Sequence, residues 1–238
     1  MSAARSGFAP DAVAYHASLA DGWERRYQKR SFRLRQTVLM NALHGRDLAG
    51  TLWLDAGCGT GTMSRWLATR GCSVLGVDAA SEMIAAANRS AQDENHSDRL
   101  SFVRITTIAR LALDDRSLDG VLCSSVLEYM SDPIVCLTQF ARVLKPGGLL
   151  LVSVPNRNSV VRRTQVACHR LGGLLGQHWC RFLNYSRHQY SRPEFEALLV
   201  RAGFSSERIV PFGSPLPGLA QRSRFWAPLL MFVAQKPA

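Results

Sequence analysis

A glycine-rich loop with an acid at its start is the part of the sequence best suited to chemistry. The stretch LDAGCGTG (54–61) places Gly57, Gly59 and Gly61 at G-x-G-x-G spacing behind a short apolar run, with Asp55 just before them. Loops of this type let the backbone approach a nucleotide. A dinucleotide site prefers G-x-G-x-x-G, which seats a pyrophosphate on a helix N-terminus, and an acid at the strand end disfavours a phosphate there.

A second acid narrows the choice of ligand. Asp78 ends the next apolar run, at about the distance past the glycines where a ribose-binding acid is expected. Its carboxylate can accept hydrogen bonds from both ribose hydroxyls, whereas Asp55 suits an ammonium group. A ligand with a ribose and adenine at one end, an amino-acid ammonium at the other and no phosphate is S-adenosylmethionine. The loop and the two acids therefore predict this cofactor.

Strands that alternate with helices are needed to position these residues. The predicted strands are 51–57, 73–78, 99–105, 117–125, 149–155, 206–212 and 225–235. The predicted helices are 62–71, 81–91, 132–144 and 191–204, preceded by one or two helices over 13–43. The predicted fold class is α/β, a doubly wound, mostly parallel seven-stranded Rossmann-like sheet with helices on both faces. In such a sheet, ligands bind outside the carboxyl ends of the strands, where the strand order reverses.

The ends of these helices carry their own signals. The residues predicted to cap or open helices are Ser81, Asp132, Pro133 and Ser191. The glycines predicted to end helices are Gly71 and Gly203. The KPGG stretch (145–148) is predicted to be a turn, and 156–190 is predicted to be irregular and basic.

Composition points to a globular cytoplasmic protein. The chain is 47% hydrophobic and 20% charged, and no apolar stretch is long enough to span a bilayer. Its start lacks the basic-then-apolar layout of a secretory signal. The six cysteines show no C-x-x-C pair and no zinc spacing, so no metal site is predicted, and buried thiols in a reducing cytoplasm are expected.

The formal net charge of +11 is spread unevenly. Residues 24–35 are dense in Arg and Lys, and a second basic region runs from Arg157 to Arg208. Such a field can attract nucleic acid, anionic lipid or an acidic small substrate. A solvated, highly charged face is the alternative interpretation.

Two long stretches resemble a known family. WLDAGCGTGTMSRWLATRGCSVLGVDAASEMIAAA (53–87) is similar to the signature region of class I S-adenosylmethionine-dependent methyltransferases, and SLDGVLCSSVLEYMSDPIVCLTQFARVLKPGGLLLVSVPN (117–156) is similar to its later motifs. The branch most resembled includes ubiquinone-biosynthesis O-methyltransferases and magnesium-protoporphyrin methyltransferases. The resemblance is strong over 50–156 and loose over 191–236. It implies the same α/β fold, S-adenosylmethionine as cofactor and methyl transfer as activity.

The resemblance also implies roles for individual residues. Gly57, Gly59 and Gly61 match the loop that lets the backbone approach the methionyl part of the cofactor, and Asp55 and Asp78 match the acids of the ammonium and ribose sides. The other positions that match cofactor contacts are Ala79 and Met83 near the adenine, Ser124 near the sulfonium, and Arg35 near the methionyl carboxylate. One departure concerns the acid that accepts from the adenine amino group in many relatives. Thr107 stands at that position, and its hydroxyl or the backbone of Ile108 would take over part of that role.

The domain organisation follows from the same resemblance. The chain is expected to be one methyltransferase domain, 1–238. Its expected parts are N-terminal helices that form a lid (1–48), a cofactor-binding core (50–155), an acceptor-side insertion after the fifth strand (156–190) and a final helix and strands (191–238).

The acceptor side offers candidate residues without a clear base. Tyr15, Leu19, Trp23 and Tyr27 fall at four-residue spacing on one face of an early helix, which predicts either a lid or a helix docked on the sheet. The aromatic and histidine residues of the insertion, which either line an acceptor pocket or pack a loop, are His169, His178, Trp179, Tyr185, His188 and Tyr190. No catalytic residue is identified from the sequence.

The predicted reaction is methyl transfer from S-adenosylmethionine to a small-molecule or lipid-like acceptor, with oxygen the preferred acceptor atom. Contact with an anionic membrane surface is one expected use of the basic region, and nucleic acid is disfavoured as a partner because no RNA-binding module is appended. The NPPY-type motif of amino-methyltransferases is absent after the fourth strand, where CSSVLEY stands. This absence disfavours N-methylation of adenine or glutamine. Two alternatives stay open, an RNA-modifying methyltransferase and a non-catalytic cofactor-binding partner protein.

Overall fold

One mixed sheet organises the chain in the computed structural model, which describes residues 10–23, 25, 30–92, 97–174, 180–215 and 223–238. Its strands are β1 (Leu52–Ala56), β2 (Ser73–Asp78), β3 (Leu100–Arg104), β4 (Leu118–Ser124), β5 (Leu144–Pro155), β6 (Ser205–Phe212) and β7 (Leu229–Gln235). The seven-stranded order is β3-β2-β1-β4-β5-β7-β6. Strands β1 to β5 pair in parallel, and β7 is antiparallel to both β5 and β6. The predicted fold class is confirmed.

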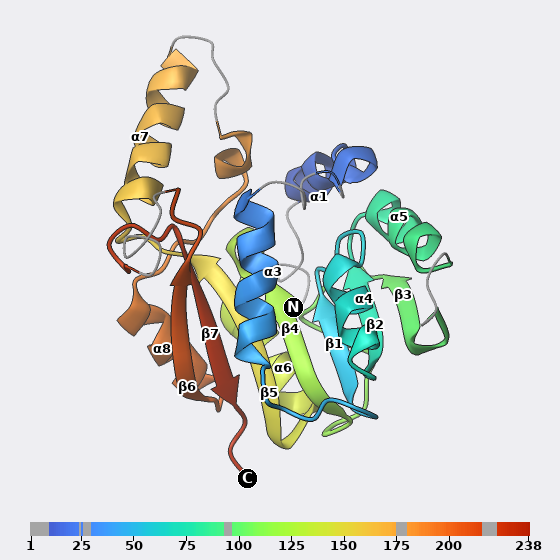
Figure 1. Ribbon diagram of the computed structural model, residues 1–238. Helices are drawn as coiled ribbons and strands as arrows, with labels where there is room; N and C mark the ends of the chain where they lie inside the picture. The colour runs from blue at the N-terminus through green and yellow to red at the C-terminus, as the bar shows by residue number, and fades with distance from the viewer. Residues whose placement is uncertain (1–9, 24, 26–29, 93–96, 175–179, 216–222) are drawn as a thin grey trace, which may run out of the picture.

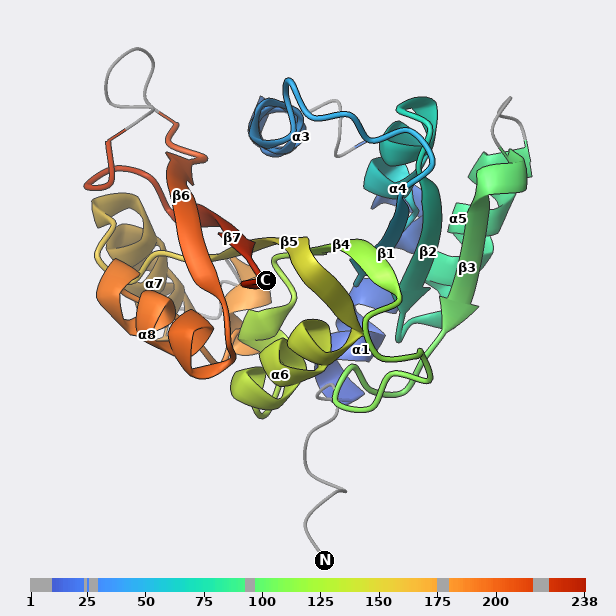
Figure 2. The ribbon, with the colours of Figure 1, turned by 90° about the horizontal axis from the view of Figure 1, so that it is seen from below.

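Helices cover both faces of this sheet because alternate strand residues point to opposite sides. On one face, α3 (Arg30–Ala42) and α4 (Thr62–Thr69) pack against a cluster that includes Trp53 and Leu122. On the other, α6 (Pro133–Val143) and α8 (Arg192–Arg201) pack against a cluster that includes Leu54 and Phe232. Figure 2 shows the two layers on either side of the strands. Helix α5 (Ser81–Gln92) lies beside β3, where the Phe102 ring joins its apolar face.

The carboxyl ends of the parallel strands meet at one edge, shown at the top of Figure 1. Helix α1 (Pro10–Ala17) lies above this edge, and α7 (Val160–Leu174) projects from the same side of the molecule. The strand order reverses between β1 and β4, so a ligand crevice is expected outside their carboxyl ends. The sheet thus turns the end of β1, the end of β2 and the residues after β4 toward one place.

Most predicted helix ends are confirmed. Gly71 has φ +87° just after α4, and Cys72 N donates to Leu67 O at 3.3 Å, which closes the helix. Ser191 and Glu194 form a capping box at α8, with Ser191 N donating to Glu194 Oε2 at 2.8 Å. Gly203 has φ +90° beyond the other end of that helix.

Two local predictions need correction, and a third, the cap at Asp132, is confirmed in position only. Ser81 is the first residue inside α5 rather than its N-cap, and its hydroxyl donates to Glu82 Oε2 at 3.1 Å. Asp132 occupies the N-cap position of α6 before Pro133, but its side chain makes no capping hydrogen bond. The predicted KPGG turn lies within the bounds of β5, although the β4–β5 register shifts between Leu118 and Gly120 beside it.

The insertion after β5 is more regular than predicted. Helix α7 covers 15 residues of it, and a short 3-10 helix, η5 (Arg181–Asn184), follows. The prediction of an irregular segment was wrong because β-branched residues and two glycines lower the intrinsic helix propensity of this stretch. The start signal is Ser159, whose Oγ accepts a hydrogen bond from Arg162 N at 3.3 Å.

Candidate active site

A cavity of about 380 Å³ opens at the carboxyl edge of the sheet. Its walls come from α1, the loop after β1, the end of β2, the residues after β4, helix α7 and the start of β7. These segments are far apart in the sequence, and the strand order brings them together at the point where it reverses. The cavity therefore occupies the expected ligand position of the fold.

The glycine loop forms part of this cavity through two of its three glycines. Gly57 has φ +77°, and a Cβ there would lie 2.3 Å from Cγ2 of Val126. Gly59 has φ +55°, and its N donates to Asp78 Oδ2 at 2.9 Å. Both line the cavity. Gly61 does not; a Cβ there would meet Phe102 at 2.6 Å, so this glycine allows helix α4 to pack closely on β3.

Asp78 lines the cavity and organises the loop. Its Oδ2 accepts from Gly59 N, and its Oδ1 accepts from Ala80 N at 2.9 Å. Burial raises the pKa of Asp78, and the backbone amides of Ala80, Gly59 and Ala79, together with His16, partly offset that rise. A carboxylate has about four acceptor sites, so Asp78 can also accept from a ligand hydroxyl in the cavity.

Asp55 lies behind the loop rather than in the cavity wall. Its side chain is buried, and Ser64 Oγ donates to Oδ2 at 2.6 Å. Burial raises the pKa of Asp55 to about 7, with a further contribution from the nearby charge of Asp78. A cation bound on the far side of the loop would favour the ionised form of Asp55 through space. The expected contact with an ammonium group is thus at most indirect.

Of the other predicted cofactor contacts, four lie in the cavity wall and two do not. Those that line the cavity are Arg35, Ala79, Met83 and Ser124. Ile108 is fully buried in the core cluster beneath the sheet. The Thr107 hydroxyl accepts a hydrogen bond from Ala109 N at 3.0 Å, and Thr107 is not part of the wall. The substitute for the adenine-binding acid therefore does not reach the cavity in this structure.

The N-terminal segment covers the glycine loop with aromatic rings. Tyr15, Leu19 and Trp23 line the cavity, and a Cβ on Gly59 would lie 3.2 Å from Trp23 Nε1. The Tyr15 ring stacks on Tyr185, with centroids 4.8 Å apart. This segment is docked through apolar contacts of Trp23 and its neighbours with Met83. The segment both packs on the domain and covers the glycine loop. Its movement as a lid stays a prediction. Tyr27 lies outside the described residues.

The histidine and tyrosine candidates of the insertion have packing roles. His169 bonds Asn184 Oδ1 at 2.7 Å, and His188 bonds Met130 O at 3.0 Å. Tyr190 is buried edge-to-face against the Phe195 ring. His169, His188 and Tyr190 do not line the cavity. His178 and Trp179 lie outside the described residues.

Polar residues that sequence reasoning missed line the other end of the cavity. Glu128 and Arg162 are 4% and 5% exposed, and Gln165 joins them in the wall. Arg35, which the resemblance placed near the methionyl carboxylate of the cofactor, lines the cavity beside them. The atoms here that are buried without a hydrogen-bond partner are Arg35 Nε, Glu128 Oε2, Arg162 Nε and Nη1, and Gln165 Oε1. The sequence signal for Glu128 was a lone acid in the apolar run after the fourth strand.

Glu128 is placed by the turn at the end of β4. Ser125 adopts φ +57°, a left-handed conformation that redirects the chain into the short 3-10 helix η4 (Leu127–Tyr129). The carbonyl of Glu128 accepts from Arg187 N at 2.7 Å, which ties η4 to the insertion. Burial raises the pKa of the Glu128 carboxyl to about 7, although Arg35 and Arg162 favour its charged form.

Comparison with known proteins assigns the chain to a family. Residues 54–152 match the methyltransferase domain family. A ubiquinone biosynthesis O-methyltransferase from Rhizobium etli is 31% identical over 198 residues, which cover 81% of this chain and 76% of that relative. The chain belongs to the class I S-adenosylmethionine-dependent methyltransferases. The family's cofactor is S-adenosylmethionine, in agreement with the prediction from the glycine loop and Asp78.

Two further similarities limit what the comparisons show beyond the family. A ubiquinone biosynthesis O-methyltransferase from Psychrobacter arcticus is 31% identical over 168 residues, and the chain spans only 62% of the length of that relative. The crystal structure of magnesium protoporphyrin IX methyltransferase (ChlM) from Synechocystis PCC 6803 with bound SAH superposes with a TM-score of 0.67 at 21% identity, covering 93% of this chain and 96% of that one. At this identity the second likeness concerns the fold.

In the described part of the chain, no helix combines the length and apolar character needed to cross a bilayer. Groups of three or more His, Cys, Asp or Glu side chains suited to a metal ion are also absent from that part.

Proposed function

We propose that this methyltransferase transfers a methyl group from S-adenosylmethionine to an oxygen atom of a small-molecule or lipid-like acceptor. The observation that carries the proposal is that one cavity joins Asp78 and the glycine loop to Glu128, a buried carboxylate with an unpartnered oxygen. A cofactor-binding end and a proton-accepting end in one cavity are what methylation of a hydroxyl needs.

The residues present fit the cofactor. Asp78 is assigned to the ribose hydroxyls, and Gly57 and Gly59 leave room for the methionyl part where a Cβ would meet Val126 or Trp23. Ala79 and Met83 are assigned to the adenine, on the side of β2. Ser124 is assigned to the sulfonium side, at the end of β4, and Asp55 to a supporting charge behind the loop. Gly61 and the buried Ile108 are assigned to packing, and the half-buried Thr107 to a hydrogen bond within its own loop.

The chain's own groups then divide the work. The bound cofactor supplies an electrophilic methyl group on a good leaving group, so orientation and exclusion of water provide much of the rate. Glu128 is assigned the acceptor's hydroxyl proton, since a carboxyl whose pKa is about 7 is matched to proton transfer near neutral pH. The rings of Tyr15 and Trp23, which line the cavity, are assigned to the exclusion of water from the bound cofactor.

Transfer of a labelled methyl group tests the proposed function. The purified protein would be incubated with methyl-labelled S-adenosylmethionine and separate panels of phenols, aliphatic alcohols, amines and bulk RNA. Label in an O-methylated small molecule is expected. Label in RNA would favour the RNA-modifying alternative, and tight S-adenosylhomocysteine binding without turnover on any panel would favour the non-catalytic one.

The Gly59→Val variant tests whether the glycine loop binds the cofactor. Its side chain would meet Trp23 and would force a β-branched residue into a left-handed conformation, so cofactor affinity is expected to fall at least tenfold, about 1.4 kcal/mol. Calorimetry with S-adenosylhomocysteine measures this. Gly147→Val is the matched control, since Gly147 also has a positive φ but lies away from the cavity with nothing near its Cβ. Normal affinity for S-adenosylhomocysteine in folded Gly59→Val would show that the glycine loop does not bind the cofactor.

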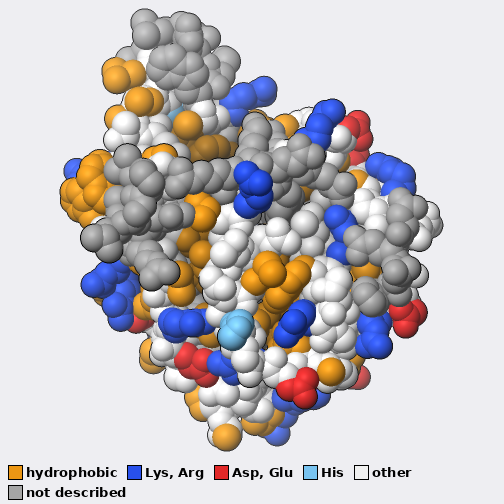
Figure 3. All heavy atoms as spheres, in the orientation of Figure 1, with side chains coloured by type: hydrophobic (Ala, Val, Ile, Leu, Met, Phe, Trp, Pro, Cys, Tyr) orange, Lys and Arg blue, Asp and Glu red, His pale blue; other side chains and the backbone are white. Residues whose placement is uncertain are grey.

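We further propose a cytoplasmic location and peripheral contact of α7 with anionic lipid. The six cysteines are free, which suits a reducing compartment. Leu171 and Phe225 are 60% and 58% exposed, and the nearby arginines Arg163 and Arg170 are exposed as well. Figure 3 shows hydrophobic side chains gathered on the projecting part of the molecule, with basic side chains dispersed over this face.

Co-sedimentation with vesicles tests the lipid contact. Binding to vesicles that contain anionic lipid is expected at low salt and should weaken as salt rises, with each arginine worth on the order of 1 kcal/mol near the surface. Arg170→Glu combined with Leu171→Ser should remove it, whereas Arg201→Glu, on exposed α8, should not. Equal binding to neutral vesicles, or none at low salt, would contradict the proposal.

A further inference from the structure

The end of the cavity formed by α7 presents hydrogen-bonding atoms that the assignments above leave unused. Nε and Nη1 of Arg162 and Oε1 of Gln165 are buried without a partner. Both residues line the cavity, and Arg162 is only 5% exposed. Buried polar groups are normally satisfied, and an unpartnered buried cation is especially costly. These atoms therefore point to a ligand with complementary groups.

Arg162 stands apart from the other arginines of the insertion. The remaining five are exposed: Arg157, Arg163, Arg170, Arg181 and Arg187. These five side chains face solvent, and Arg162 is buried. Its burial on the inner side of α7 separates it from the solvated basic face and gives it a different role.

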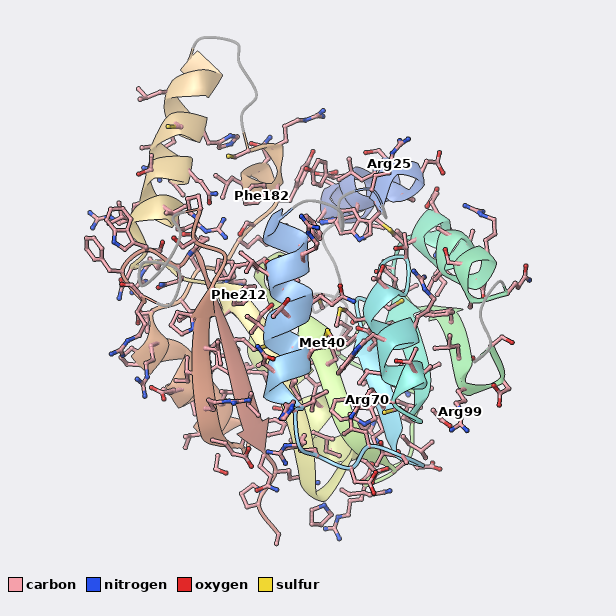
Figure 4. All side chains as sticks on the ribbon, in the orientation of Figure 1. Arg25, Met40, Arg70, Arg99, Phe182 and Phe212 are labelled. Carbon is pink, nitrogen blue, oxygen red and sulfur yellow. The ribbon has the colours of Figure 1, made fainter. Side chains whose placement is uncertain are left out.

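The guanidinium of Arg162 is held in place before any ligand arrives. Nη2 donates to Pro228 O at 3.4 Å, and the guanidinium carbon lies 5.4 Å from the centroid of the Phe182 ring. Phe182, in η5, lies at the same end of the molecule as α7 (Figure 4). These contacts hold the side chain, so little ordering is needed on binding. They leave Nε and Nη1 without a partner in a residue that lines the cavity.

The charges at this end of the cavity favour an anion. Arg162 and Arg35 both face Glu128, and among the described residues no acid lies within ion-pair distance of Arg162. Two cations thus lie near one carboxylate, and neither is paired with it. A guanidinium binds a planar carboxylate well, while Gln165 Oε1 and Glu128 Oε2 require donors such as hydroxyls.

We infer that the acceptor is a hydroxy acid, whose carboxylate binds Arg162 and whose hydroxyl groups donate to Gln165 and Glu128. This rests on the proposed function and names the substrate class for the same site. Arg162 is assigned to the acceptor rather than the cofactor because of its place in the fold. Helix α7 follows β5, whereas Asp78 ends β2, and the two strands lie on opposite sides of the switch point between β1 and β4, where the strand order reverses. The acceptor carboxylate stays unmethylated. The proton of the acceptor's hydroxyl group passes to Glu128, and the hydroxyl oxygen forms the bond to the methyl carbon. The electrons of the broken carbon–sulfur bond stay on sulfur.

A matched pair of ligands tests this inference. A dihydroxybenzoate and the corresponding dihydroxybenzamide differ in charge and little in shape, and their binding would be measured by calorimetry on protein saturated with S-adenosylhomocysteine. The benzoate is expected to bind about tenfold or more tightly, the scale of a charge-assisted hydrogen bond. Arg162→Met should abolish this preference and Arg162→Lys should keep part of it. Arg163→Met, the exposed neighbour, should keep all of it.

The outcomes separate this inference from the proposed function. Failure of wild-type protein to bind S-adenosylhomocysteine would overturn the proposed function. Normal binding of it, with equal affinity for benzoate and benzamide, would overturn the inference alone and needs no variant. Loss of S-adenosylhomocysteine binding in folded Arg162→Met would assign Arg162 to the cofactor instead. A methylated product that alkali hydrolyses to methanol is an ester and would also contradict the inference, whereas a stable methyl ether supports it.

Discussion

Asp78→Ala is expected to weaken S-adenosylhomocysteine binding by about 1.5–3 kcal/mol, the usual scale for hydrogen bonds to a charged group. The variant removes the carboxylate assigned to the ribose and also the acceptor for Gly59 N and Ala80 N. The loop loses its anchor together with the ligand contact. Isothermal titration calorimetry measures the change, with thermal unfolding as the check that the variant is folded.

Two further variants separate these contributions. Asp78→Asn keeps one oxygen that can accept a backbone hydrogen bond but removes the charge, so an intermediate loss is expected. Glu82→Ala removes an exposed acid from the first turn of neighbouring α5 and should leave affinity unchanged. An unchanged dissociation constant in folded Asp78→Ala would show that the end of β2 does not hold the ribose.

Glu128→Gln is expected to lower kcat/KM by about 10²–10⁴-fold, the usual contribution of a positioned general base. The amide keeps the size of the side chain and removes its basicity. S-adenosylhomocysteine affinity should stay within about twofold, since Glu128 is assigned to the acceptor end. Steady-state kinetics on the acceptor found in the labelling assay measures the effect.

The pH profile gives an independent readout. A base must be ionised to act, and burial has raised the pKa of Glu128 to about 7, so wild-type kcat/KM should rise up to tenfold per pH unit below that value and level off above it. The groups that also face this carboxyl are Arg35 from α3, Arg162 from α7 and Tyr129 from η4. The ring centroids of His16, in α1, and Tyr129 lie 4.9 Å apart. Folded Glu128→Gln that keeps both wild-type kcat and this acidic limb would exclude the role.

The cofactor end of the cavity was predictable because its parts are close in sequence. β1, the glycine loop, α4 and β2 follow one another over residues 52–78, and the parallel pairing of β1 with β2 places the loop beside Asp78. Apolar periodicity and turn residues suffice to predict such a unit. The position of Gly61 was predictable, but not its role, since only the packing of Phe102 shows that it faces the interior.

The acceptor end was not predictable for a physical reason. Glu128 and Arg162 lie in η4 and α7, on either side of β5, and only the tertiary fold brings them to one cavity. α7 has weak intrinsic helix propensity, so local pattern did not reveal it. Thr107 and Ile108 were assigned by position alone, and the loop after β3 turns them away from the cavity wall.

The most direct test of the account is a crystal structure of the protein with S-adenosylhomocysteine. The account predicts the ligand in the cavity at the switch point, with both ribose hydroxyls within about 3.2 Å of the Asp78 carboxylate and the sulfur directed toward the space between Ser124 and Glu128. A ligand bound elsewhere, or in the cavity without ribose contacts to Asp78, would contradict it.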